Sequence, residues 1–311
     1  MSIMAPAAHR KLTGLVAATF TPLTNQGEIN LSVIGPYIDY LTETQGVKSV
    51  FVNGTTGEGM SLSVEERKVL AEDWCLKGKG KLDQVIVHVG CTSLKDAQEL
   101  ARHAAQIGVD GISVIAPSFF KPQNAAELRS FLQEVAAAAP NVPFYYYHLP
   151  AFTGVNVTAR DVLEGIETFI PSYRGVKFTG FDLTDMGQCV SCSRPDWVVL
   201  YGMDEQLLAG LVLGVDGAVG STYNYVGRHM NELITAFENN NLIQARKIQF
   251  KLQELITFAT KLGFNVGVNK RLMAELSGLH LGPPRLPLTP CAAVLAENLT
   301  EKFHSLFPSE Q

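Results

Sequence analysis

Eight short apolar segments, separated by stretches with helical spacing, constrain the fold of this 311-residue chain more than any other feature. A short, almost continuous apolar run is typical of a strand buried on both faces, as in a parallel sheet covered by helices. The segments lie at 12–18, 49–52, 84–89, 111–116, 144–148, 174–179, 197–202 and 217–220. The chain is therefore predicted to be an α/β protein with eight parallel strands.

Helical patterns fill the intervals between these segments. At 63–77, Ser63 and Glu66 have the spacing of a capping box, and Gly108 follows the next helical stretch as a C-terminal cap. Eight strand–helix units within about 220 residues predict a closed (β/α)8 barrel, the TIM-barrel fold. An open doubly wound sheet is the alternative, but the glycine fingerprint of dinucleotide binding is absent after the first strand. Further helices are expected at 29–43, 93–107, 125–139, 159–169, 183–189 and 205–213.

The pattern changes after residue 225, where strand-like segments stop. Helical spacing continues at 230–238, 242–262, 268–277 and 292–306, and Gly-Pro-Pro-Arg-Leu-Pro at 282–287 interrupts it. We therefore expect a barrel over residues 1–228 and a C-terminal helical extension over residues 229–311 that packs on the barrel.

The composition is that of an ordinary globular protein, with 46% hydrophobic and 18% charged residues. The net charge of -5 disfavours nucleic acid and anionic membranes as partners, since both favour a basic surface. Residues 1–11 lack the apolar core of a secretory signal, so a cytoplasmic location is expected. Cys189 and Cys192 have the spacing of a metal or redox pair, but no second pair or histidine cluster accompanies them, and we expect no metal site there.

Lys177 is the most informative single residue. It lies in the sixth predicted strand between Val176 and Phe178, and alternation across the strand points it away from both. A buried ammonium group is costly unless it is paired. Desolvation also favours the neutral amine, which can attack a carbonyl carbon and form a Schiff base. The structural alternative is a lysine that snorkels to solvent or pairs with a carboxylate.

Polar residues follow several predicted strands, at the edge where TIM-barrel enzymes place their active sites. After the second strand, small residues at 53–59 would let backbone amides and the hydroxyls of Thr55 and Thr56 hold an anion, although a tight turn alone would have the same composition. Tyr147 ends the fifth strand and can either shuttle protons or pack in the core.

The seventh and eighth strands also end in polar groups. Asp204 and Glu205 follow Gly202, and Ser221 follows the last strand. These residues can bind a ligand, or the two acids can simply begin a helix and Ser221 can cap one.

Three motifs together resemble the N-acetylneuraminate lyase and dihydrodipicolinate synthase family. They are Gly-Thr-Thr-Gly-Glu at 54–58, Tyr-His-Leu-Pro at 147–150 and Gly-Val-Lys-Phe-Thr at 175–179, in the order and spacing of that family. The resemblance runs from about residue 12 to residue 287. Three stretches are similar to the vertebrate lyase branch: Phe-Val-Asn-Gly-Thr-Thr-Gly-Glu at 51–58, Phe-Tyr-Tyr-Tyr-His at 144–148 and Leu-Gly-Pro-Pro-Arg-Leu-Pro at 281–287.

The resemblance implies a role for each matching residue. Lys177 corresponds to the Schiff-base lysine, Tyr147 to the proton-relaying tyrosine, and Thr55 and Thr56 to the hydroxyls that hold the substrate carboxylate. The positions expected to bind the sugar part are Thr179, Gly202, Asp204, Glu205 and Ser221. The family implies reversible aldol cleavage of N-acetylneuraminate to pyruvate and N-acetylmannosamine, no metal or organic cofactor, small-molecule substrates, and a homotetramer.

Two departures and two alternatives accompany this resemblance. Many relatives place a tyrosine from a neighbouring subunit in the site, whereas this chain has Pro-Ser-Phe-Phe-Lys-Pro at 117–122. The synthases carry an arginine after the tyrosine motif, whereas this chain has Ala-Phe-Thr at 151–153. The alternatives are a different pyruvate aldolase or synthase, and a silent relative that binds a keto acid as a sensor or scaffold. Intact Lys177 and Tyr147 count against the silent relative.

Overall fold

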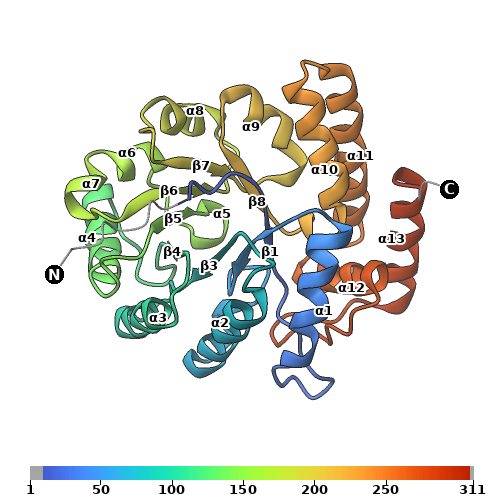
Figure 1. The fold of residues 1–311 in the computed structure, drawn as a ribbon, viewed down its shortest axis with the longest axis horizontal. Coiled ribbons are helices and arrows are strands. Elements are labelled where there is room, and N and C mark those ends of the chain that lie inside the picture. The colour runs from blue at the N-terminus through green and yellow to red at the C-terminus, as the bar shows by residue number, and fades with distance from the viewer. Residues whose placement is uncertain (1–9, 309–311) are drawn as a thin grey trace.

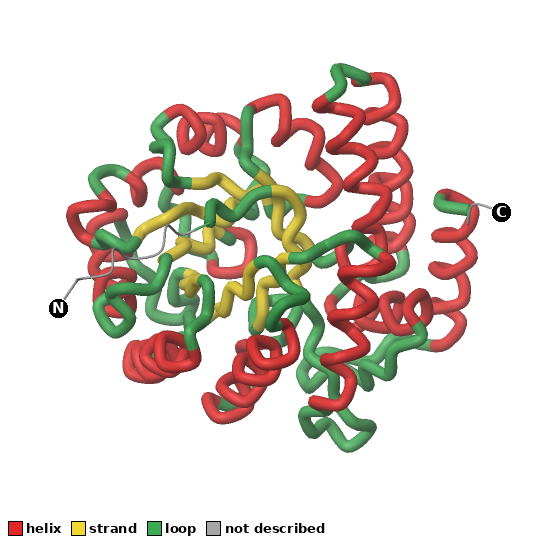
Figure 2. The backbone as a smooth tube through the Cα atoms, in the orientation of Figure 1, coloured by secondary structure: helices red, strands yellow, loops and turns green. Residues whose placement is uncertain are grey.

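The computed structural model describes residues 10–308, which form a closed barrel of eight parallel strands inside a ring of helices (Figures 1 and 2). Each strand pairs with the next along the chain, and β8 pairs with β1. All eight predicted strands are confirmed, and closure excludes the open sheet. The strands are β1 Gly14–Ala18, β2 Ser49–Val52, β3 Gln84–His88, β4 Gly111–Ile115, β5 Phe144–His148, β6 Tyr173–Phe178, β7 Val198–Tyr201 and β8 Gly217–Gly220.

Helices alternate with the strands and cover the outside of the barrel (Figure 1). The predicted capping box is present, because Ser63 Oγ accepts the Glu66 N–H and Glu66 Oε2 accepts the Ser63 N–H. The helices of the barrel are α1 Ile34–Asp39, α2 Val64–Gly78, α3 Leu94–Ile107, α4 Ala125–Ala136, α5 Pro150–Thr153, α6 Ala159–Leu163, α7 Ile166–Phe169, α8 Leu183–Ser191 and α9 Leu207–Leu213.

Several helices differ from the prediction. The stretch 29–43 is α-helical only over α1, which lies between a 3₁₀ turn at Leu31–Val33 and a π-helical turn at Tyr40–Thr44, and the helix expected at 230–238 already begins at Tyr223. The stretch 159–169 is two helices rather than one, since Gly165 between α6 and α7 has a φ of 63°, a left-handed conformation that ends a helix. The short α5 was not predicted, because four residues starting at Pro150 are too few to show helical spacing.

The C-terminal helices lie together on one side of the barrel (Figure 1). They are α10 Tyr223–Glu238, α11 Leu242–Lys261, α12 Val266–Ser277 and α13 Ala293–Leu306. Helix α10 begins directly after β8 and packs against β1, so the expected boundary between residues 228 and 229 falls inside this helix.

The core has two parts, as expected for a barrel of alternating side chains. Val176 and Phe178 pack outward against the helices, whereas Phe51, Tyr145 and Tyr147 belong to the cluster inside the barrel. Where the barrel closes, Gly14 lies opposite Gly217, and a Cβ atom at Gly217 would lie 2.3 Å from the carbonyl oxygen of Gly14. The first residue pair of the seam, by which we mean the paired residues of β1 and β8, therefore has no side chains.

Two further points concern membrane-spanning helices and the N-terminal segment. No helix in residues 10–308 has the length and hydropathy needed to cross a membrane. The expectation that residues 1–11 form no secretory signal is not tested for residues 1–9, which lie outside the described residues.

Candidate active site

Lys177 points into the barrel near the C-terminal end of β6. Its side chain does not snorkel, since the residue is only 5% exposed. The Nζ atom lies 4.1 Å from the ring centroids of both Phe51 and Tyr147. Burial lowers the pKa of Lys177 to about 7, while the charge of Asp204 acts in the opposite direction. Neutral amine is therefore available near neutral pH.

Tyr147 lies beside Lys177 on the neighbouring strand, as its partner in the β5–β6 register. Its hydroxyl oxygen lies 3.2 Å from Thr55 Oγ1, within hydrogen-bonding distance. Burial raises the pKa of Tyr147 to about 12, opposed in part by the hydrogen bond with Thr55. The phenol therefore stays protonated at neutral pH, and it can donate a proton or pass one along.

The turn after β2 places Thr55 and Thr56 at the barrel mouth. Asn53 and Glu58, at either end of the turn, have positive φ values of 62° and 56°. Thr21 Oγ1 donates a hydrogen bond of 2.6 Å to the carbonyl oxygen of Gly57, which fixes the middle of the turn. The two threonines line the same cavity as Lys177.

The ends of β7 and β8 supply the remaining polar groups. Asp204 is buried, and its Oδ2 atom accepts hydrogen bonds from the Thr222 backbone N–H at 2.9 Å and hydroxyl at 2.6 Å. Burial raises the pKa of Asp204 and of Glu205, whereas the bonds from Thr222 act against that rise at Asp204. At Gly202 a Cβ atom would lie 1.9 Å from Thr179 Oγ1, so only glycine fits there.

All nine predicted residues line one cavity of about 340 Å³ at the mouth of the barrel. Sequence reasoning missed its apolar wall, which comes partly from α11 and the loop after it. Phe152, which the sequence shows in place of the synthase arginine, also lines this wall, and the missed residues are Phe181, Met203, Ile256, Thr260 and Phe264. No motif pointed to the last three, because they lie 79 or more positions beyond Lys177 in an ordinary amphipathic pattern.

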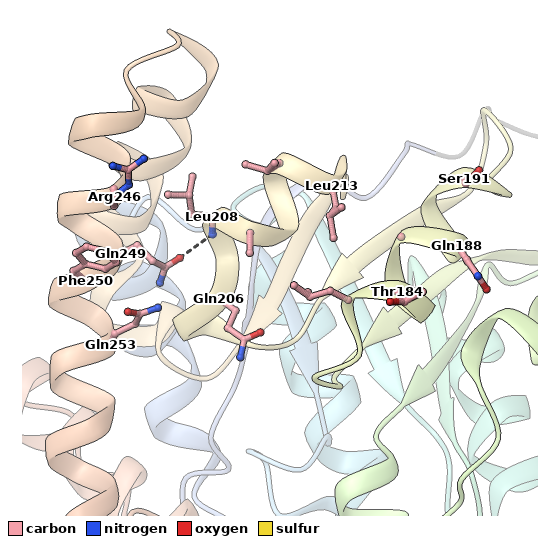
Figure 3. Close-up of a pocket in the computed structure, with 14 residues that line it drawn as sticks. Thr184, Gln188, Ser191, Gln206, Leu208, Leu213, Arg246, Gln249, Phe250 and Gln253 are labelled. Atoms are coloured by element: carbon pink, nitrogen blue, oxygen red, sulfur yellow. Dashed lines mark hydrogen bonds between the residues drawn. The ribbon is translucent and has the colours of Figure 1, made fainter.

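A larger cavity of about 1040 Å³ lies outside the barrel, between α8, α9 and α11 (Figure 3). Its walls are mainly apolar, from residues such as Leu208, Leu213 and Phe250, and Arg246 is its only charged lining residue. Size alone would favour this cavity. We place the chemistry in the smaller cavity, because the buried lysine and the convergent polar groups lie there.

Two other expectations concern residues outside the cavity. His148 packs on the outer face of β5, where Nδ1 lies 3.2 Å from the Tyr146 hydroxyl and Nε2 lies 3.9 Å from Asp185, in keeping with a structural role. Cys189 and Cys192 are both free thiols. Across residues 10–308 no three His, Cys, Asp or Glu side chains form a group that could hold a metal ion.

Comparison with known proteins places this geometry in a family. The model of the dihydrodipicolinate synthetase family matches residues 11–305. The N-acetylneuraminate lyase of Danio rerio is 65% identical over 95% of this chain and 97% of its own length. The Homo sapiens N-acetylneuraminate lyase is 56% identical over 96% of this chain and 93% of its own length.

Solved structures of N-acetylneuraminate lyases have the same fold as this chain. The N-acetylneuraminate lyase of Proteus mirabilis has a TM-score of 0.90 and 36% identity, covering 96% of this chain and 99% of its own. The lyase of Aliivibrio salmonicida also has a TM-score of 0.90, with 38% identity over 96% of this chain and 97% of its own. The chain therefore belongs to the dihydrodipicolinate synthetase family, in the branch of the N-acetylneuraminate lyases.

Proposed function

We propose that the cavity at the barrel mouth cleaves N-acetylneuraminate reversibly into pyruvate and N-acetylmannosamine, through a Schiff base on Lys177. N-acetylneuraminate lyase activity is what the chain shares with relatives that are 53–65% identical to it. The observation that carries the mechanism is the buried Lys177 amine, with a pKa of about 7, beside the Tyr147 hydroxyl.

The first stage forms the covalent intermediate. The neutral amine of Lys177 attacks the ketone carbon of the open-chain sugar acid, and the carbinolamine then loses water to give an iminium ion. Both steps move protons between nitrogen and oxygen. The protonated Tyr147 hydroxyl is placed to carry them, since it lies next to Lys177 and contacts Thr55.

The second stage breaks the carbon–carbon bond. The electron pair of the C3–C4 bond moves into the iminium ion, the C4 hydroxyl loses its proton, and N-acetylmannosamine leaves as an aldehyde. The enamine that remains is protonated at C3 and hydrolysed, which releases pyruvate and restores Lys177. Covalent attachment thus replaces one difficult step with several easier ones.

The two parts of the substrate would occupy two parts of the cavity. The hydroxyls of Thr55 and Thr56, with the adjacent backbone amides, would hold the carboxylate beside the reacting ketone. The polyhydroxylated chain would reach the polar groups at the ends of β6, β7 and β8, which are Thr179, Gly202, Asp204, Glu205 and Ser221.

Reductive trapping tests this proposal. Borohydride should fix pyruvate onto the protein, and peptide mass spectrometry should locate the adduct on Lys177. Lys177→Ala should lose both the adduct and sugar cleavage, whereas Lys247→Ala, on an exposed residue of α11, should lose neither. An adduct on another lysine, or no adduct in the unmodified protein, would overturn the mechanism. A silent relative would form the adduct without cleaving N-acetylneuraminate.

We also propose a homotetramer in the cytoplasm, in keeping with the resemblance to the family. Phe119 and Phe120, which follow β4, are 79% and 86% exposed, and burial against a second subunit would cover them. Sedimentation analysis of the full chain tests the assembly.

We further propose that α10 is the last helix of the barrel and that α11, α12 and α13 form the C-terminal extension.

A further inference from the structure

We infer that two consecutive buried residues of α12, Asn269 and Lys270, are positioning residues that hold the sugar half and the carboxylate half of the active site. This inference rests on the proposed function. It concerns a helix of the extension that does not itself line the cavity. Strand β1 alone separates β8 from β2 in the closed barrel, so one helix can reach the loops that follow both strands.

Lys270 forms a fully buried ion pair with Glu58. The Nζ atom of Lys270 lies 2.9 Å from Glu58 Oε1, and the two side chains are 1% and 0% exposed. Lys270 also donates to the carbonyl oxygen of Pro283 at 3.0 Å, and Glu58 Oε2 accepts the Arg285 N–H at 2.6 Å. Such a pair is costly to desolvate and has little net effect on stability, so its position next to the site points to a role in fixing geometry.

Glu58 ends the turn that presents the carboxylate-binding threonines. Its backbone N–H donates to the Thr55 carbonyl oxygen at 3.0 Å, and its φ of 56° is held against the usual preference of a non-glycine residue. Thr55 in turn contacts the Tyr147 hydroxyl. Lys270 therefore acts on the site through Glu58, by holding the last residue of the turn.

Asn269 acts on the other half of the cavity. Its Nδ2 donates to Ser221 Oγ at 2.8 Å, and its Oδ1 accepts from the Tyr225 hydroxyl at 2.9 Å, which fixes the amide orientation. Because Ser221 Oγ accepts this bond, its own hydrogen is free to be donated to a substrate hydroxyl. Asn269 thus sets the hydrogen-bonding direction of Ser221.

Helix α11 supports the neighbouring turn in the same way, and Figure 3 shows one of its contacts, the bond from the Leu208 N–H to Gln249. Gln249 donates to the carbonyl oxygen of Asp204 at 3.2 Å and accepts the Leu208 N–H at 2.8 Å. Gln253 donates to the carbonyl oxygen of Glu205 at 2.9 Å. The extension therefore contacts three of the four loops that carry proposed binding residues, those after β2, β7 and β8, and α12 contacts both the loop after β2 and the loop after β8.

The test separates positioning from plain stability by measuring the two halves independently. Lys270→Met should raise the pyruvate concentration that gives half-maximal borohydride trapping on Lys177 by about tenfold, because a loosened turn holds the carboxylate poorly. Asn269→Ala should leave that concentration within about twofold and raise the KM for N-acetylneuraminate by about tenfold. Lys247→Met, on the exposed face of α11, is the matched control and should change neither value.

A lone Lys270→Met leaves Glu58 as an unpaired buried charge, and the variant can fail to fold. The double variant Glu58→Gln with Lys270→Met removes both charges, and Lys270→Arg keeps the charge. Positioning predicts that the folded double variant still has a raised half-saturating pyruvate concentration and that Lys270→Arg regains part of the affinity.

Two outcomes would overturn the inference. One is a folded double variant that binds pyruvate as the unmodified protein does. The other is equal effects of the Asn269 and Lys270 changes on both measurements. Either result leaves the proposed function intact, since that function fails only if the unmodified protein forms no adduct on Lys177 or does not cleave the sugar acid.

Discussion

The Nζ atom of Lys177 lies 4.1 Å from the centroid of the Tyr147 ring, and the two residues are register partners on adjacent strands. The ring of Phe51 lies at the same distance from that nitrogen. Ring faces attract cations, whereas burial disfavours an ammonium group with three N–H donors to satisfy. An iminium ion on the Lys177 nitrogen also carries a positive charge, but it has only one N–H donor to satisfy. In the proposed mechanism, this arrangement would favour the neutral amine before attack and the cationic intermediate after it.

The pH dependence of adduct formation should report the Lys177 amine. Because only the neutral amine attacks, the rate of pyruvate trapping should rise with pH through about 7 and level off above it. The charge of Asp204 raises the pKa of Lys177, so Asp204→Asn should move the rising limb to lower pH. The measurement is the trapping rate between about pH 5 and pH 9. A trapping rate that rises only near the ordinary lysine pKa would contradict the conclusion that burial lowers the pKa of Lys177.

Removing the Tyr147 hydroxyl should slow turnover with little change in packing. Tyr147→Phe is expected to lower kcat by roughly two to four orders of magnitude, the usual contribution of a positioned proton donor or acceptor. Tyr145→Phe is the matched control, since Tyr145 lies on the same strand and the same inner face but lines a different cavity. Steady-state kinetics of both variants decide the matter, and a Tyr147→Phe variant with normal kcat would reduce Tyr147 to a core residue.

Loss of the Asp204 carboxylate should weaken sugar binding more than pyruvate binding. Asp204→Ala removes a buried acceptor of two bonds from Thr222, and the cost to N-acetylneuraminate should be about 1–3 kcal/mol. Pyruvate trapping should survive when it is measured at about pH 9, where Lys177 is neutral with or without Asp204. Equal impairment of the two assays would show that the site does not divide into two halves.

The chain should act on a sugar acid and not on the substrate of the synthases. Aspartate semialdehyde brings a second carboxylate that calls for a cation, whereas the chain offers Phe152, 70% exposed, where the synthases have arginine. Incubation with pyruvate and aspartate semialdehyde should therefore give no appreciable condensation product. Product analysis by mass spectrometry, with N-acetylneuraminate cleavage as the positive control, checks this expectation.

Local sequence signals predicted the barrel well because each unit carries its own pattern. Most of the buried strands are almost continuous apolar runs, and all nine predicted site residues lie at or just after strand ends, which barrel closure brings into one cavity. Residues that support the site but lie far from its motifs in the sequence could not be predicted in this way. Lys270 looks like a solvent-facing helical lysine in the sequence, and only the fold brings it to Glu58. The contacts of Gln249 with Asp204 and of Asn269 with Ser221 could not be predicted for the same reason.

The seam between β1 and β8 has a consequence for how the chain is made. Gly14 pairs with Gly217, roughly 200 residues later, so the longest-range contact of the sheet forms only when most of the chain has left the ribosome. Until then β1 has an open edge, which is a template for wrong pairing between nascent chains. A Cβ atom at Gly217 would lie 2.3 Å from the Gly14 carbonyl oxygen, so substitutions there should lower both the yield of folded protein during synthesis and the stability of the finished barrel.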